Sequence, residues 1–310
     1  MLTKKLGNII NLILCVVCIY FLLVYPGYCI EAAKDGLTTA LYIVLPSIFP
    51  FMVISRFIIS SGLYYTASKF IGSIFEKAFG IDKQYAAVFL LGCIGGYPVG
   101  SIILSDLLNK KEISIKQAEH LVGICNNASP MFVIGTVGTL LLNNTSYGYI
   151  LYTIHITSVC LCGIIMKAIF RPRFSQKFCR YNVKCNSPLT EAVTNSGANM
   201  INIASYIIIF SVISKFVTMI LKEQNCSFIL CLLEITNGIK YCIESSMPEV
   251  IKLSLISFSL GFSGLCVFSQ SRAIFGDSQI SFSKYFFAKS IIAILSFLTS
   301  YVVFAIIFSH

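Results

Sequence analysis

Long apolar segments recur along the whole chain, and most polar residues lie between them. A helix needs about 20 mainly apolar residues to cross the hydrocarbon core of a bilayer. The segments predicted to span the membrane are residues 8–28, 37–62, 120–142, 147–170, 196–221, 250–270 and 285–308. The pattern therefore predicts an all-α polytopic membrane protein.

Two further apolar segments carry helix-breaking or polar residues in the middle. Residues 84–108 are interrupted by GCIGGYPVGS, and residues 226–243 are interrupted by LEITNG. Proline cannot donate a backbone hydrogen bond and glycine tolerates tight turns, so the first interruption favours two short helices that meet at a tip. We predict that both segments are re-entrant helical hairpins. The segment from Tyr64 to Lys83, charged on one side and apolar on the other, is predicted to lie on the membrane surface.

Composition and charge agree with a membrane protein. The chain is 56% hydrophobic and 12% charged, whereas soluble domains carry about 25% charged residues. The formal charge is +10, from 23 Lys and Arg against 13 Asp and Glu. With the amino terminus inside, most basic residues fall in inside loops, and Lys284 and Lys289 count among them at the start of the last span. No nucleic-acid partner is expected, because no recognition motif accompanies the charge.

The spans and hairpins occur in the same order twice. We interpret residues 1–310 as a single transmembrane domain with approximate repeat halves at 37–170 and 191–308. In each half a hairpin precedes a span with its own interruption, and the hairpins would enter from opposite sides. This is an inverted repeat with broken helices, and paired interruptions of this kind indicate a transporter site near the bilayer midplane. Residues 1–36 are expected to hold an uncleaved N-terminal anchor helix, because no convincing cleavage site follows its apolar run.

The interruptions supply the candidate binding residues. Unpaired backbone groups in hydrocarbon are costly, so the breaks must face protein or water. Half-helices that begin after a break present free N–H groups and a positive dipole end, which suit a carboxylate or phosphate. The predicted substrate-binding residues are Gly96, Tyr97, Pro98, Asn126, Asn127, Ser129, Glu234, Thr236 and Asn237.

Several of these residues have structural alternatives. An intramembrane carboxylate such as Glu234 indicates function by default, and the alternative is a position near the aqueous end where Lys240 or water neutralises it. His155 is interpreted as a hydrogen-bonded core residue rather than a proton relay. Most cysteines lie in apolar runs, so no metal or other cofactor is predicted. No catalytic motif is present, and we expect no enzymatic activity.

Five ordered motifs carry a family resemblance: LPSIFPF (45–51), GGYPVG (95–100), NNASP (126–130), LEITNG (233–238) and GFSGLCVFSQ (261–270). Together they resemble the YlbJ (SpoVV) family of sporulation integral membrane proteins, over residues 40–300. That family is similar to the nucleoside-recognition (Gate) domain of nucleoside transporters. The resemblance implies a transporter that moves dipicolinic acid from the mother cell toward the forespore, across the outer forespore membrane.

The implied substrate is a small planar dianion, which suits half-helix N-termini and the amides of Asn126 and Asn127. Glu234 would repel it unless protonated or paired, so this residue either carries a coupling proton or fixes the hairpin tip. The expected mechanism is alternating access, with each hairpin gating the shared site from one face. Two alternatives remain: a transporter of nucleosides or other small metabolites, and a non-transporting scaffold. The scaffold would recruit sporulation membrane proteins through basic loops that include Arg171 and Arg173. Association with copies of the same chain is also open.

Overall fold

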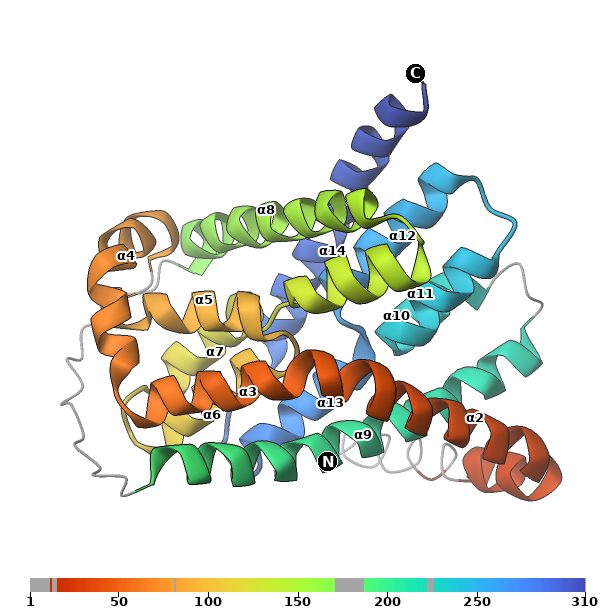
Figure 1. The fold of residues 1–310 in the computed structure, drawn as a ribbon, viewed down its shortest axis with the longest axis horizontal. Coiled ribbons are helices and arrows are strands. Elements are labelled where there is room, and N and C mark those ends of the chain that lie inside the picture. Colours follow the sequence, from red (N-terminus) through yellow and green to blue (C-terminus); the bar gives the residue numbers. More distant parts are fainter. Residues whose placement is uncertain (1–11, 13–15, 81, 171–186, 222–225, 310) are drawn as a thin grey trace, which may run out of the picture.

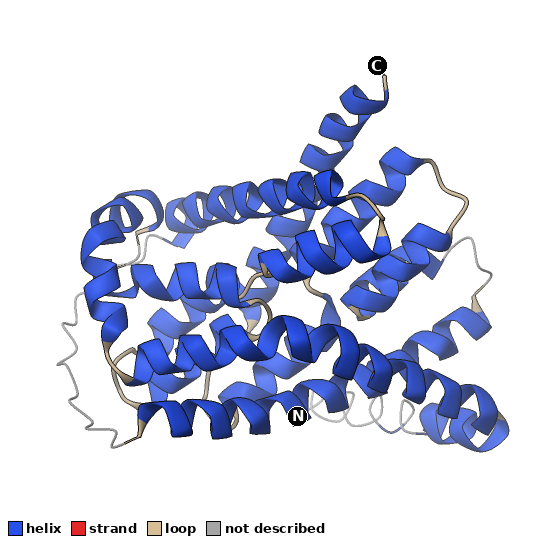
Figure 2. Cartoon of the chain, in the orientation of Figure 1, coloured by secondary structure: helices blue, strands red, loops and turns tan. Residues whose placement is uncertain are grey.

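The computed structural model describes residues 12, 16–80, 82–170, 187–221 and 226–309. Every regular element within these residues is a helix (Figure 2). Five helical segments among them are long and apolar enough to cross a membrane: Pro26–Ser60, Thr145–Phe170, Pro188–Ile220, Glu249–Phe275 and Ser283–Phe308. The predicted all-α polytopic class is confirmed.

The first described span is longer than the predicted segment 37–62. It runs without interruption through α2 (Pro26–Thr38), the π-helix η1 (Thr39–Val44) and α3 (Leu45–Ser60). Pro26 is suited to the first helical position, because the N–H that it lacks would have no partner there. Gly36 allows close packing on α9 (Pro188–Ile220), since a Cβ at this position would lie 2.9 Å from Cα of Ile208. Of the predicted first span, residues 8–28, the positions 8–11 and 13–15 lie outside the described residues, and residues 16–24 are helical.

Both predicted hairpins are present as pairs of short helices. The first consists of α5 (Ala86–Gly95) and α6 (Val99–Asn109), and the second of α10 (Cys226–Leu233) and α11 (Ile235–Glu244). In Figure 1 the two pairs approach the middle of the molecule from opposite ends. This arrangement is the one expected of an inverted repeat, while the assignment of inside and outside stays a prediction.

A broken helix follows each hairpin. In the first half, α7 (Ile115–Cys125) is separated from the π-helix η3 (Met131–Leu141) by an irregular segment that includes the two adjacent asparagines. In the second half, α12 (Glu249–Phe262) is separated from α13 (Gly264–Phe275) at Ser263, whose φ is +70°. The predicted span 120–142 is therefore two short helices, because the NNASP segment interrupts it. Long helices α8 (Thr145–Phe170) and α14 (Ser283–Phe308) complete the two halves.

The predicted surface segment is helix α4 (Leu63–Phe79). Its apolar face is open, with Phe70 84% exposed. At its base the Tyr64 hydroxyl donates to the carboxylate of Glu112, and the Tyr85 hydroxyl donates to the Glu112 carbonyl at 2.7 Å. Burial, followed by the hydrogen bond to Glu112, raises the pKa of Tyr64 well above its ordinary value, so the hydroxyl stays protonated and donates. These contacts fix α4 to the loop between α6 and α7.

Candidate functional site

The tips of both hairpins line one cavity near the middle of the molecule. Its lining residues are Val44, Ile48, Tyr97, Ala128, Ser129, Phe132, Ile203, Ile207, Glu234, Ile235, Thr236, Cys266, Val267 and Gln270. The space between them amounts to about 450 Å³, including the part open to the outside. Tyr97 and Ser129 thus lie together with Glu234 and Thr236, which follow them by more than 100 residues in sequence. A mostly apolar lining with a few polar groups is typical of small-molecule sites.

The first hairpin tip, at Gly96, Tyr97 and Pro98, is buried and contacts both halves. Gly96 has a φ of +81°, and a Cβ there would lie 2.9 Å from Cβ of Ser129, so the tip packs directly on the NNASP segment. The Tyr97 hydroxyl donates to the Leu260 carbonyl on α12 at 2.6 Å. Tyr97 therefore connects the tip of the first half to the broken helix of the second.

The two adjacent asparagines lie in the wall of the site and do not line the cavity. Asn126 donates through Nδ2 to the Ser271 hydroxyl at 3.0 Å and to the Tyr285 hydroxyl at 3.3 Å. Ser101 on α6 donates to the same Ser271 oxygen at 3.0 Å. Asn127 donates to the Ile124 carbonyl at 2.7 Å, which satisfies a carbonyl at the end of α7. These contacts join α6, α7, α13 and α14 at the first break.

The remaining NNASP residues order the start of η3. The Ser129 hydroxyl accepts a hydrogen bond from the Phe132 N–H at 3.1 Å. His155, on α8, accepts through Nε2 from the Ala128 N–H at 3.2 Å. His155 is therefore a hydrogen-bonded core residue, as interpreted from the sequence, and it supports a backbone group that the break exposes.

Glu234 caps the second half of the second hairpin. Its side chain is buried, with the residue 2% exposed, and its Oε2 accepts from the Asn237 N–H at 2.7 Å. Asn237 in turn donates through Nδ2 to the Ser211 hydroxyl on α9 at 3.1 Å. Lys240 does not neutralise Glu234 by an ion pair, but contacts Thr39 Oγ1 at 3.3 Å. Of the two roles proposed for Glu234, these contacts agree with fixing the hairpin tip.

The structure places Lys289 inside a buried part of helix α14 and not in a loop. It was counted among the inside loops, but the structure buries it on α14 with 1% of its surface exposed. Its ammonium donates to the Asn126 carbonyl and to Asn127 Oδ1, the latter at 3.3 Å. The ring centroids of Tyr97 and Tyr285 lie 5.0 and 5.8 Å from Nζ. The negative end of the α7 dipole and these two rings compensate part of the cost of burying the charge.

A signal for Lys289 was present in the sequence. Helix α14 begins at Ser283, which places Lys289 about 9 Å along it at 1.5 Å per residue. The predicted span 285–308 already contained this lysine, and a lysine inside a span is a functional hypothesis by default. Counting it as a loop charge concealed that.

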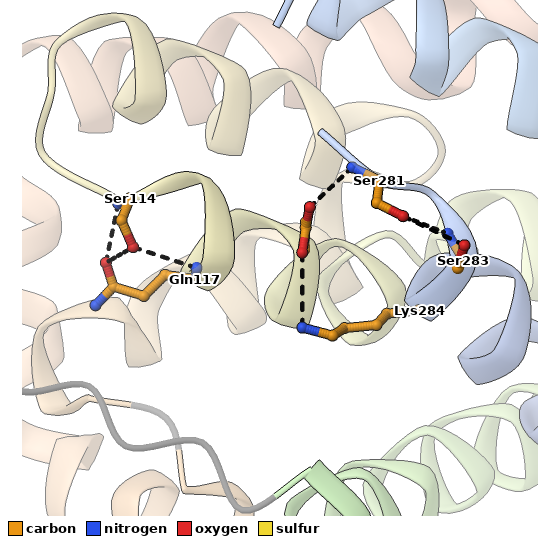
Figure 3. Close-up of polar contacts among 6 residues, drawn as sticks. Ser114, Gln117, Ser281, Ser283 and Lys284 are labelled. Carbon is orange, nitrogen blue, oxygen red and sulfur yellow. Dashed lines mark hydrogen bonds and ion pairs between the residues drawn. The ribbon is translucent and has the colours of Figure 1, made fainter. Parts of the chain in front are cut away.

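The start of α14 is fixed against α7 near this lysine. Glu119 on α7 accepts from the Ser281 N–H at 2.9 Å and forms an ion pair with Lys284 at 3.6 Å. Figure 3 shows these contacts beside the Ser114–Gln117 capping box, in which Ser114 Oγ accepts from the Gln117 N–H at 3.3 Å. With α7 ordered at its beginning and joined to α14, the ammonium of Lys289 is held at the end of α7.

The comparisons with known proteins give one informative relative. The sporulation integral membrane protein YlbJ of Bacillus subtilis (strain 168) is 24% identical in an alignment that covers 86% of this chain and 75% of that protein. The predicted resemblance to the YlbJ family is confirmed by this relative. No protein-family model and no solved structure matches the chain. The similarity of the YlbJ family to the Gate domain therefore stays a prediction.

The similarity to YlbJ and the apolar helices indicate the same class of protein. This chain is an integral membrane protein, and the relative's name supports a membrane role in sporulation. Substrate and direction are considered below.

Proposed function

We propose that this chain is a transporter, rather than an enzyme, that moves dipicolinic acid across the outer forespore membrane from the mother cell toward the forespore. The observation that carries the proposal is the cavity shared by two hairpin tips that approach from opposite ends. A site reached from both ends by separate hairpins is the arrangement that alternating access requires. The sporulation role of the relative YlbJ points to the same process.

The two hairpins would act as the gates. Displacement of the α5–α6 tip would open the cavity toward one end, and displacement of the α10–α11 tip would open it toward the other. The Tyr97–Leu260 hydrogen bond holds the first tip, and the Glu234 cap orders the second. One gate closes the site while the other is open, so the substrate is never in continuous contact with both compartments.

The charge distribution supports an anionic substrate. Lys289 places an ammonium beside the ring of Tyr97, and none of the ion pairs found between the described residues includes it. The ring of dipicolinic acid is planar and aromatic, so the Tyr97 and Phe132 rings that line the cavity offer it stacking surfaces. A positive charge and two aromatic faces suit an aromatic carboxylate.

Transport can be measured directly in proteoliposomes that contain trapped terbium ions, which become luminescent when dipicolinate chelates them. We expect saturable uptake by the unmodified chain. Ile207→Trp fills the cavity because Ile207 lines it, and uptake should fall at least tenfold. The matched control is Ile209→Trp, two residues further along the same helix and 49% exposed, which should transport normally. Equal uptake by both variants would mean that this cavity is not the route.

A nucleoside or similar neutral metabolite is the second candidate. Thr236 and Gln270 provide uncharged hydrogen-bonding groups in the lining, and Glu234 adds an acceptor. These groups suit a neutral, polar ring better than a dianion. In the same liposomes, uptake of labelled uridine without uptake of dipicolinate would support this candidate. The scaffold alternative depends on Arg171 and Arg173, which lie outside the described residues.

A further inference from the structure

We propose that Lys289 is the residue that selects an anionic substrate and that it fixes which edge of that substrate faces α14. The inference rests on the proposed transport function. Lys289 lies directly behind the cavity wall, and its ammonium is bound to the carboxyl end of α7.

The charge of Lys289 has no carboxylate partner in the described part of the chain. The ion pairs found there use Arg56, Lys83, Lys215, Lys252 and Lys284, each bound to an aspartate or glutamate. Lys289 is more deeply buried than any of these, yet its acceptors are a backbone carbonyl and an amide oxygen. Neutral acceptors satisfy its hydrogen-bonding groups and leave its net charge uncancelled.

The ammonium is separated from the cavity by a single layer of residues. Tyr97 lines the cavity, and its ring centroid is 5.0 Å from Nζ. Asn127, which accepts from Nζ, directly precedes the lining residues Ala128 and Ser129. Tyr97 is also the tip residue of the first hairpin, so movement of that tip uncovers the ammonium. Opening of the first gate and exposure of the cation are therefore one event.

A carboxylate can replace a neutral acceptor at this position. Hydrogen bonds between ionised partners are stronger than those to a carbonyl oxygen. Lysine has three donors on a flexible stem, so Nζ can bind a substrate carboxylate and keep the Asn126 carbonyl. The ligand class that this chemistry selects is an aromatic carboxylate whose ring stacks on Tyr97.

Glu234, at the tip of the second hairpin, gives the site a direction. Its carboxylate lines the cavity and is already bound to the Asn237 N–H. A second carboxylate placed beside it would be repelled. In pyridine-2,6-dicarboxylate both carboxylates flank the ring nitrogen, so one edge is negative and the opposite edge carries only C–H groups. The negative edge should face Lys289 and the C–H edge should face Glu234. The 2,5-isomer cannot adopt this orientation, because its carboxylates lie on opposite edges.

The test measures equilibrium binding to the purified full chain by calorimetry, with three probes: pyridine-2,6-dicarboxylate, its 2,5-isomer and the neutral pyridine-2,6-dicarboxamide. Lys289→Gln removes the charge and keeps a donor for the Asn126 carbonyl. It should weaken binding of the 2,6-dicarboxylate by about ten- to a hundredfold, the value of one charged hydrogen bond, and leave the dicarboxamide unchanged. The control is Lys83→Gln, which removes a charge paired with Glu76 outside the cavity lining and should change neither affinity.

The outcomes separate the two proposals. If Lys289→Gln binds the 2,6-dicarboxylate as tightly as the unmodified chain, the role of Lys289 is wrong and the transport proposal stands. If the unmodified chain binds neither of the two pyridine dicarboxylates, the substrate class itself is wrong. Tighter binding of the 2,5-isomer than of the 2,6-isomer would overturn the proposed orientation.

A second variant tests the proposal if Lys289→Gln does not fold. Lys289→Arg keeps the positive charge and should keep the preference for the 2,6-dicarboxylate over the dicarboxamide. A well-folded Lys289→Arg that binds both compounds equally would overturn the proposal.

Discussion

The broken helix of the first half and the hairpin tip of the second half both lie at the cavity, and opposite charges stabilise them. At the first, the carboxyl end of α7 carries free carbonyl groups, and the ammonium of Lys289 donates to them. At the second, the amino end of α11 carries free N–H groups, and the carboxylate of Glu234 accepts from one of them. Each side-chain charge is opposite in sign to the partial charge of the helix end that it binds.

The difference shows how a repeated architecture can enclose an asymmetric site. Both halves share the order of hairpin, broken helix and long helix, yet the charged side chain at the cavity binds the broken helix of the first half and the hairpin of the second. A cation therefore lies behind the wall of the first break, and a carboxylate lies in the wall of the second. A line from this cation to this carboxylate defines a charge axis. Such an axis orients a substrate whose charge is concentrated on one edge.

The largest effect is expected from a change that forces the first break apart. A Cβ at Gly100 on α6 would lie 1.9 Å from the Cys125 carbonyl oxygen, a backbone atom that cannot move aside. Gly100→Ala should cost about 3 kcal/mol or more, at the upper end of overpacking effects, and remove most of the monodisperse protein. Size-exclusion chromatography after heating measures this. Gly197→Ala is the control, because no atom lies within 4 Å of the added Cβ. Equal melting of both variants would contradict the close approach.

A smaller effect on stability is expected at the tip of the second hairpin. Glu234→Ala removes the cap of α11 and should lower stability by about 1 kcal/mol. Uptake of dipicolinate should be lost, because the second gate loses its ordered tip, while membrane insertion stays normal. Glu234→Asp can still cap the helix and should retain partial uptake. Normal uptake by Glu234→Ala would show that the cap is dispensable for transport.

A loss of stability of similar size is expected when the hydrogen-bond network around Ser271 is disrupted. Ser271→Ala removes the hydroxyl shared by Asn126 and Ser101. We expect a loss of about 1–2 kcal/mol, since buried polar groups lose a partner, measured as a lower melting temperature in detergent. Ser205→Ala is the matched control, because its exposed hydroxyl bonds only within its own helix. The network has no energetic role if the two variants melt alike.

The smallest effect should come from charges away from the breaks. Lys83 and Glu76 form an ion pair at 3.3 Å with side chains 59% and 52% exposed. Lys83→Gln should change stability by less than about 0.5 kcal/mol, because solvent screens such pairs. Dipicolinate uptake should be unchanged, in contrast to Lys289→Gln. If Lys83→Gln lost as much uptake as Lys289→Gln, transport would depend on positive charge in general and not on the charge at Lys289.

Much of the architecture could be predicted because its signals are local. Glycine, proline and amide residues inside apolar runs directly indicate the hairpins at Gly96 and Glu234 and the break at Asn126. The partners of those breaks could not be predicted. Tyr285 and Lys289 reach Asn126 across about 160 residues of sequence, and nothing in the periodicity of α14 indicates which helix it packs against. The length of the first described span was also missed, because Pro26 and Gly36 are typical of a loop yet both fit a helix at these positions.

The most direct test of the charge axis is a crystal structure of the full chain with 4-bromopyridine-2,6-dicarboxylate. Its bromine lies on the edge opposite the two carboxylates and is located by anomalous scattering. The account predicts a bromine position inside the cavity lined by Tyr97 and Thr236, closer to Glu234 than to Lys289. A bromine outside that cavity, or one closer to Lys289 than to Glu234, would contradict it.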